Sequence, residues 1–195
     1  MNAPTTVDEL LDLFERLGGD YYGEDVSQLD HALQCAALAR RDGADDELVC
    51  AALLHDIGHL VVDRGSEAGW RDDVDDDHHE AVGARILAAL FGPSVAAPVA
   101  LHVTAKRWRC TVDPAYRASL SATSRATLVA QGGPLDEAAC KRFEAHPASA
   151  HAVALRGWDD EGKDPDVSPG RLSDYEPLLR ALAARAATAA GRAGT

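Results

Sequence analysis

The sequence has few aromatic residues, few basic residues and no long apolar run. Aromatics make up only 5% of the 195 residues, whereas hydrophobic residues make up 46%, with Ala and Leu prominent. Ala and Leu are strong helix formers, so this composition favours packed helices over sheets. The net charge of −13 excludes the basic face that a nucleic-acid-binding protein needs. Most of that charge is expected on a solvated acidic surface.

The cysteines and the termini exclude several further classes of protein. Cys35, Cys50, Cys110 and Cys140 form no C-x-x-C pair, which fits a reducing cytoplasm. Cys35 and Cys50 lie in apolar helical patterns and are expected to be buried. The first residues show no signal peptide, and no run approaches the roughly 18 apolar residues of a membrane span. We therefore expect a cytoplasmic protein without a membrane partner.

Apolar residues recur at helical spacing along most of the chain. Helices are expected over 7–17, from Ser27, from Asp45 to about Leu60, from 78, over 95–103 with a kink at Pro98, before Gly132, over 135–146 and 147–158, and from 173 to about 190. The segments 61–77 and 109–120 are expected to be loops. With no repeat, linker or alternating strand pattern, the sequence predicts an all-α fold with one domain over 1–195 and its core at about 7–190.

The most informative stretch is Cys50–Leu60, in which an apolar run leads to His55-Asp56 and then His59. On one helix His55 and His59 would share a face. Asp56 would lie about 100° away, so one metal could be held by His55 and Asp56 together. The dipeptide alone is weak, since one His-Asp pair is expected by chance in a chain of this composition.

Further His and Asp residues at helix-sized intervals strengthen the pattern. His31 to His55, Asp56 to His79 and His79 to His102 span 24, 23 and 23 residues, and Asp159 follows 57 residues after His102. A helical bundle could project all of these side chains into one interior cavity. Mixed imidazole and carboxylate ligands suit iron, manganese or zinc, and a carboxylate such as Asp56 can bridge two metals.

The order His31, His55-Asp56 and Asp159 resembles the H…HD…D signature of the HD-domain superfamily. His79 and His102 match its dinuclear subset. His79-Glu-Ala-Val-Gly-Ala84 resembles the family's H-E-x-x-G-A helix start, where His78 is a rival ligand. The resemblance implies an all-α HD-domain helical bundle with a dinuclear metal site in its interior.

Other stretches resemble a narrower group, the PhnZ-type mixed-valent diiron oxygenases, which cleave the carbon–phosphorus bond of 1-hydroxyphosphonates. These stretches are Tyr21-x-Gly-Glu24-x-Val-Ser-Gln-x-x-His31, His59, His102-x-x-x-Lys106, Ser124-x-x-Thr127-x-x-x-Gln131-Gly-Gly-Pro and Leu155-Arg156-x-Trp-Asp159-x-x-x-Lys163. The similarity covers residues 20 to 163.

The resemblance implies a role for each matching residue. One iron would be held by His31, His55, Asp56 and Asp159, and the other by Asp56, His79 and His102. Tyr21 would occupy an iron position at rest and leave when substrate arrives, assisted by Glu24. The phosphonate would be held by His59, Lys106, Ser124, Thr127 and Arg156. Cationic and hydroxyl donors of this kind also suit a dianion on chemical grounds alone.

The implied activity is an O2-dependent oxidation by an Fe(II)/Fe(III) pair that releases phosphate and a carboxylic acid. The best guess for the substrate is 2-amino-1-hydroxyethylphosphonate, giving glycine, because Glu24 could face an amine. A trimethylammonio analogue, as in the TmpB-type relatives, is an alternative, although no aromatic cage is evident. A separate enzyme would make the hydroxyphosphonate. The sequence leaves the oligomeric state open.

Several alternatives remain at this stage. The protein could be a metal-dependent HD phosphohydrolase acting on a phosphate ester or nucleotide, or a non-catalytic sensor. A hydrolase has no evident need for Tyr21 and Glu24, which could instead be a loop aromatic and a helix-terminal charge. Lys106 and Arg156 could be surface cations, Ser124 and Thr127 helix caps, and Gln131 part of a turn only. His146 and His151 are expected at the surface.

Overall fold

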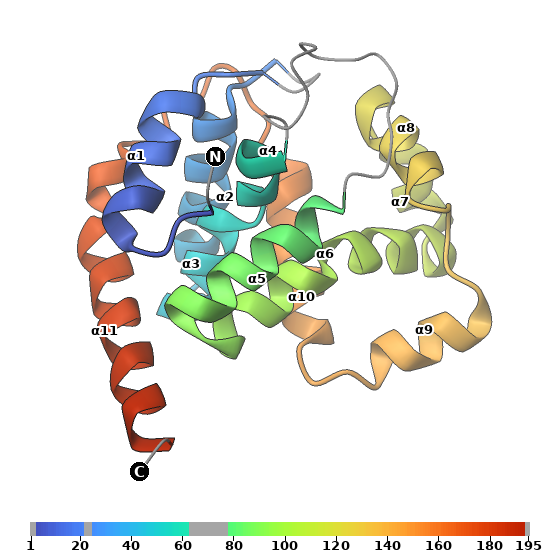
Figure 1. Cartoon of the computed structure of the whole chain (residues 1–195). Coiled ribbons are helices and arrows are strands. Elements are labelled where there is room, and N and C mark those ends of the chain that lie inside the picture. Colours follow the sequence, from blue (N-terminus) through green and yellow to red (C-terminus); the bar gives the residue numbers. More distant parts are fainter. Residues whose placement is uncertain (1–2, 22–24, 63–77, 194–195) are drawn as a thin grey trace.

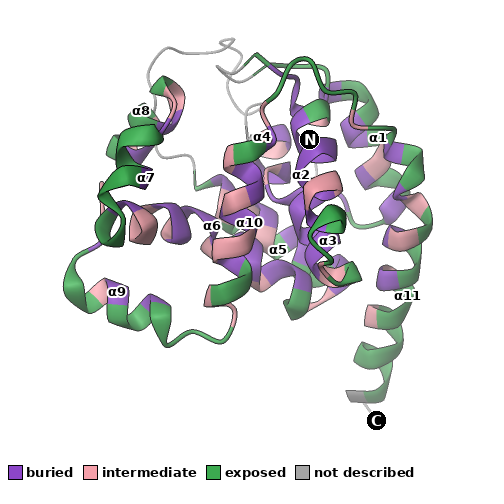
Figure 2. Cartoon of the chain, turned by 180° about the vertical axis from the view of Figure 1, so that it is seen from behind, coloured by how far each residue is buried: buried purple, intermediate pink, exposed green. Residues whose placement is uncertain are grey.

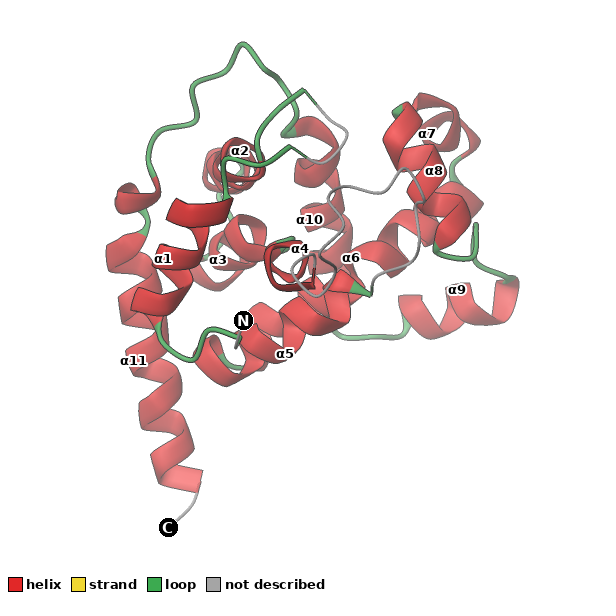
Figure 3. Cartoon of the chain, turned by 45° about the horizontal axis from the view of Figure 1, so that its top comes forward, coloured by secondary structure: helices red, strands yellow, loops and turns green. Residues whose placement is uncertain are grey.

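The computed structural model describes residues 3–21, 25–62 and 78–193, and most of them are helical (Figure 1). The helices are α1 (Val7–Leu17), α2 (Gln28–Arg41), α3 (Asp46–Leu54), α4 (Ile57–Val62), α5 (His79–Phe91), α6 (Pro93–Val112), α7 (Pro114–Ser119), α8 (Ala122–Ala130), α9 (Glu137–Glu144), α10 (Ser149–Glu161), the 3₁₀ helix η2 (Leu172–Asp174) and α11 (Glu176–Ala193). No β-strand occurs in these ranges, where only Tyr21 and Ser27 form an isolated bridge (Figure 3). The all-α prediction is confirmed.

Side-chain caps fix where the helices that carry the site begin. The Ser27 hydroxyl accepts a hydrogen bond from the Asp30 N–H at 3.1 Å, and the Asp45 carboxylate accepts one from the Leu48 N–H at 2.8 Å. Each bond satisfies a backbone donor of the first helical turn. The predicted starts of α2 and α3 are thereby confirmed.

One large apolar cluster fills the centre of the molecule. Helices α2 and α3 pack together, α5 packs along α6, and α10 crosses α6. Their inner faces are buried, whereas the second half of α11 is exposed (Figure 2). The fully buried large side chains of this cluster include Leu10, Leu33, Leu53, Leu54, Ile57, Leu87, Leu155 and Leu179.

Two smaller clusters include residues from the second half of α6. The helices that they attach, α7, α8 and α9, lie to one side of the other helices (Figure 1). Cys110, Tyr116, Leu120 and Leu128 hold α7 and α8 against α6. A second set, Ala105, Leu135, Cys140, Phe143 and Ala152, attaches α9. The helices α7 and α8 therefore depend on packing that is separate from the main cluster.

The prediction of one continuous helix from Asp45 to about Leu60 is wrong. Helix α3 ends at Leu54, and α4 begins at Ile57. The His59 N–H donates to the Asp56 carbonyl at 3.0 Å across the break. The break brings α4 directly against the first turn of α5: a Cβ on Gly58 would lie 2.0 Å from the His79 carbonyl oxygen. That tertiary contact, rather than local propensity, decides the break.

Three further boundaries differ from the prediction. Helix α6 continues through Pro98 to Val112, twenty residues in all, because it packs between α5 and α10. The expected loop 109–120 contains the end of α6 and all of α7. Helix α10 begins at Ser149 after the N-cap Ala148, so Pro147 is not its first residue.

Some predictions lie outside what the structure tests. Glu24 and the acidic run 72–77 are not among the described residues, and the single-domain assignment over 1–195 stays a prediction. All four cysteines are free and buried, as expected of Cys35 and Cys50. Among the described helices, none combines the length and apolarity of a membrane span.

Candidate metal centre and anion pocket

Four side chains from three parts of the fold form a first donor group. His31 lies on α2, His55-Asp56 at the break between α3 and α4, and Asp159 on α10. His31 Nε2 is 3.3 Å from His55 Nε2, 3.7 Å from Asp56 Oδ2 and 3.6 Å from Asp159 Oδ1. His55 Nε2 is 3.4 Å from Asp56 Oδ2. Donors about 2.1 Å from a shared ion lie about 3.0 to 3.4 Å apart. Two of these four separations fall in that range, and the other two are slightly longer.

The other oxygen of Asp56 faces a second donor group. Asp56 Oδ1 is 3.6 Å from His79 Nε2 and 3.7 Å from His102 Nε2, and these two nitrogens are 3.2 Å apart. His79 begins α5 and His102 lies in the middle of α6. The carboxylate of Asp56 thus stands between two clusters of donors, one oxygen toward each, which is the arrangement of a bridging ligand.

Backbone carbonyls orient three of the four histidines. His31 Nδ1 donates to the Gly162 carbonyl at 2.8 Å, His55 Nδ1 to that of Ala52 at 2.9 Å, and His102 Nδ1 to that of Val99 at 2.7 Å. A carbonyl only accepts, so these Nδ1 atoms carry the protons and the Nε2 atoms keep their lone pairs. His31 and His55 therefore direct two acceptors at each other, and a bound cation would relieve this repulsion.

The protonation states are those of metal ligands. Burial lowers the pKa of His31, and it lowers the pKa of His102 to about 3, so both imidazoles are neutral. Burial alone would raise the pKa of Asp159, but the charges of Arg156 and Lys163 outweigh it and hold that pKa well below its usual range. Neutral imidazoles and ionised carboxylates are ready to bind a metal without releasing a proton.

Glycines allow the backbone contacts that bring the donors together. Gly58 meets the His79 carbonyl, as described above, and Gly83 lies against the His55–Gly58 turn, where a Cβ would be 3.3 Å from Ile57 Cγ2. Gly162, whose carbonyl orients His31, would place a Cβ 2.8 Å from Cys35 Sγ. A side chain at Gly58 or Gly162 would therefore push apart elements that carry donors.

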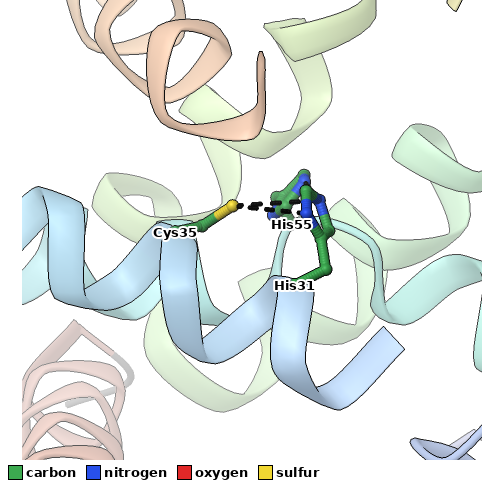
Figure 4. Close-up of side chains that lie close together, drawn as sticks. All are labelled: His31, Cys35 and His55. Atoms are coloured by element: carbon green, nitrogen blue, oxygen red, sulfur yellow. Dashed lines mark hydrogen bonds between the residues drawn. The ribbon is translucent and has the colours of Figure 1, made fainter. Parts of the chain in front are cut away.

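Cys35 lies beside the first donor group (Figure 4). Its Sγ is 3.8 Å from the ring nitrogens of His31, and its thiol donates to the Trp158 carbonyl at 3.4 Å. Sγ also lies near enough to His31 and His55 to form a possible ligand set with them. Burial raises the pKa of Cys35, which keeps the thiol protonated, whereas metal ligation needs the thiolate. We therefore assign Cys35 to packing around His31.

Buried cations adjoin the donors because the same two helices carry both. Lys106 follows His102 by one turn of α6, and Arg156 precedes Asp159 by one turn of α10. Both cations are buried, with exposed fractions of 3% and 4%. Lys106 Nζ donates to Thr127 Oγ1 at 2.8 Å, and Arg156 Nη1 donates to Asp159 Oδ2 at 2.6 Å. Ser124 is also buried, one turn before Thr127 on α8.

A few buried polar side-chain atoms in the described part of the chain are left without a partner. Among the described residues, four buried side-chain atoms have no hydrogen-bond partner: Glu80 Oε2, Tyr116 Oη, Gln131 Oε1 and Arg156 Nε. Glu80 follows the donor His79, and its Oε2 is 3.8 Å from His79 Nδ1. Buried polar groups in proteins normally have partners. Two of the four belong to residues beside the donors, Glu80 next to His79 and Arg156 bonded to Asp159, so a polar ligand bound at the donor groups would complete their hydrogen bonding.

The remaining predicted site residues are placed as follows. His59 stacks on His79 with ring centroids 3.8 Å apart and also lies within ligand distance of Asp56. His79 is buried in the second donor group, whereas its rival His78 is exposed and has a positive φ of 51°. Tyr21 is 62% exposed and, within the described residues, has no hydrogen bond to either donor group. The predicted role of Tyr21 at the metal centre therefore stays a prediction.

Three residues near the site were not predicted to belong to it. Gln131 is buried one turn beyond Thr127, and its motif was visible but attributed to the following turn. Lys163 Nζ is 3.8 Å from Asp159 Oδ1, at a spacing of four residues that the sequence shows. Tyr116 has no sequence signal, because its relation to Arg156 depends on how α7 packs.

The donor order, the helical architecture and the interior donor groups together define the class of this protein. The chain belongs to the HD-domain family, whose sequence model matches residues 29–138. The HD-domain prediction is thus confirmed.

Two relatives narrow this assignment. The chain is 41% identical over 169 residues to hydroxymethylphosphonate dioxygenase of Gimesia maris, covering 87% of this chain and 84% of the relative. It is 34% identical over 183 residues to [1-hydroxy-2-(trimethylamino)ethyl]phosphonate dioxygenase (glycine-betaine-forming) of Leisingera caerulea, covering 93% and 92%. The resemblance to phosphonate-cleaving oxygenases is therefore confirmed, and these relatives act on two different phosphonates.

Proposed function

We propose that this protein is a diiron oxygenase that uses O2 to cleave the carbon–phosphorus bond of a small 1-hydroxyphosphonate. The observation that carries the proposal is Asp56, whose two oxygens face separate donor groups on helices that also carry the buried cations Lys106 and Arg156. The names of the two relatives support the same reaction class.

The donor sets fit two iron ions. His31, His55, Asp56 and Asp159 would hold one, and Asp56, His79 and His102 the other, with neutral imidazoles and carboxylates that suit iron. When bound, the ions would supply dioxygen binding and the electron transfer of the oxidation. Tyr21 and Glu24 remain proposed participants at the resting site.

The chain's own contribution is to bind and orient the phosphonate. Lys106 and Arg156 neutralise its charge, and the Ser124 and Thr127 hydroxyls complete its hydrogen bonds. His59 would contact the phosphonate from its position on the ring of His79. Because α6 and α10 carry both cations and donors, the bound phosphonate would hold C1 and its hydroxyl next to the metal centre.

The proposed reaction leaves one property of the substrate to be assigned, the size of the substituent on C1. A trimethylammonium group favours an aromatic cage. Among the described aromatics, Trp108 donates to Glu144, Trp158 donates to Asp42, and Tyr175 lies under Arg40. None of these partners is a metal donor or a proposed phosphonate-binding residue. We therefore propose hydroxymethylphosphonate or 2-amino-1-hydroxyethylphosphonate rather than the trimethylammonio analogue, supplied by a separate hydroxylating enzyme.

The test is phosphate release from each of the three hydroxyphosphonates, with and without O2, by protein loaded with iron and partly reduced with ascorbate. Hydroxymethylphosphonate and O2 balance to formate and phosphate, and the amino substrate balances to glycine and phosphate. We expect O2-dependent release with about two irons per chain. A Lys106→Met variant should raise the KM strongly while keeping the irons.

Two outcomes would contradict the proposal. Phosphate release that does not need O2, or release only from phosphate esters with manganese or zinc, would identify a phosphohydrolase. Tight phosphonate binding without turnover in any condition would identify a sensor. Preference for the trimethylammonio substrate would leave the reaction class intact and overturn the size argument.

A further inference from the structure

Tyr116 presents a buried hydroxyl without a partner. It lies on α7 at 7% exposure, and its ring packs with Cys110, Leu120 and Leu128. Its Oη is buried and unpartnered among the described residues. A phenylalanine would fill the same apolar cluster without this penalty, so the hydroxyl calls for another explanation.

A continuous chain of contacts links Tyr116 to the anion pocket. The Arg109 guanidinium lies 3.8 Å from the centre of the Tyr116 ring, and its Nη1 donates to Asp160 Oδ2 at 3.3 Å. Asp160 Oδ1 accepts from Arg156 Nη2. Burial raises the pKa of Tyr116, and the neighbouring Asp160 carboxylate raises it further. The phenol therefore lies within reach of Asp160, although no hydrogen bond of normal geometry joins them.

Arg156 also has an unused donor. Its Nη1 and Nη2 bond to Asp159 and Asp160, which leaves the buried Nε without a partner among the described residues. Lys106 lies one turn before Cys110 on α6, and Cys110 packs on Tyr116. Two unpaired donors, Tyr116 Oη and Arg156 Nε, therefore lie on α7 and α10, which both pack against the α6 helix that carries Lys106.

We propose that Tyr116 is a further substrate-binding residue, whose hydroxyl donates with Arg156 Nε to the phosphonate oxygens. Three phosphonate oxygens can accept more bonds than Lys106, Ser124 and Thr127 supply. The inference rests on the proposed function for the identity of the anion. Asp160 and Arg109 act as positioning residues, because they fix the guanidinium and the phenol relative to each other.

Tyr116→Phe tests the proposal, because it removes one oxygen and keeps the ring. Tyr175→Phe is the matched control: Tyr175 is also buried, at 3% exposure, and also lies under a guanidinium, that of Arg40, but in the main cluster. The readouts are calorimetric binding of methylphosphonate to metal-loaded protein, the KM and kcat for hydroxymethylphosphonate, and the Tm.

Tyr116→Phe is expected to raise both Kd and KM by roughly 10- to 100-fold, the effect of losing a hydrogen bond to a charged group. Its kcat should change less than about twofold, and its Tm should not fall, because an unpaired hydroxyl is removed. Tyr175→Phe should leave Kd and KM unchanged. Asp160→Asn should weaken methylphosphonate binding, because Asp160 holds the Arg156 guanidinium. In the Tyr116→Phe background, Asp160→Asn should weaken binding by less than it does in the wild type.

Unchanged Kd in Tyr116→Phe would overturn the proposal, and so would a lower Tm with the same loss of affinity in both tyrosine variants. Methylphosphonate has no C1 hydroxyl and cannot be turned over, so its binding does not depend on the oxygenase reaction. If the wild type binds methylphosphonate but releases no phosphate from hydroxymethylphosphonate with O2, the proposed function fails. The effect of Tyr116→Phe on methylphosphonate binding can still be measured in that case.

Discussion

The two donor groups share Asp56 but differ in how completely the protein builds them. The first has four donors, and backbone carbonyls hold both of its histidines. The second has three donors, with His79 stacked against the half-buried His59. A metal in the first group would take most of its ligands from the chain, whereas one in the second would keep positions open for a ligand. The first group would therefore hold a metal tightly, and the second would leave ligand positions where substrate could bind.

Removing the shared carboxylate of Asp56 should have the largest effect, because both donor groups depend on it. Asp56→Ala should lower the iron content of both groups and reduce activity on the order of 10³-fold or more, because each ion loses a charged ligand. Iron per chain and O2-dependent phosphate release are the measurements. Asp166→Ala, an exposed acid near α10, should change neither. Full retention of two irons in Asp56→Ala would show that the groups do not share this ligand.

Removing one histidine from either group tests whether the two groups bind iron with different strength. His102→Ala leaves the four-donor group intact and should retain about one iron per chain after passage over a chelator. His31→Ala leaves two three-donor groups and should retain less. Both variants should be inactive. Losing a residue that hydrogen-bonds a metal ligand already lowers metal affinity by roughly 10- to 100-fold, and losing the ligand itself should lower it more. Equal iron contents in the two variants would remove the distinction between the sites.

The smallest expected effect concerns the pocket beside the second group. Burial lowers the pKa of Lys106 to about 8, so kcat/KM should fall as pH rises through 8, by about tenfold at pH 9. Stability should move the other way: between pH 8 and 10.5 the unfolded chain binds more protons at Lys106, so the free energy of unfolding rises with pH. Lys106→Arg should shift the kinetic fall upward, and an unshifted profile would exclude Lys106 as its cause.

The donors could be predicted because each stands on or directly after a helix whose periodicity the sequence shows. Intervals of about one helical hairpin place His31, His55, His79 and His102 on neighbouring elements, and the structure brings them together. The break at His55-Asp56 could not be predicted, since it follows from the contact of Gly58 with the His79 carbonyl. Tyr116 could not be found either, because its unpaired hydroxyl exists only once α6, α7 and α10 pack.

The separate packing of α7 and α8 suggests how such a protein can change its substrate over evolution. Ser124, Thr127 and Tyr116 lie on α7 and α8, which a cluster of four side chains, Tyr116 among them, attaches to α6. The helices that bear the histidines are anchored in the main cluster. If the proposed function holds, substitutions on α7 and α8 would change the substrate contacts without disturbing the metal donors. The two relatives are named for different phosphonates, which is the variation expected when substrate contacts and metal donors rest on separate clusters.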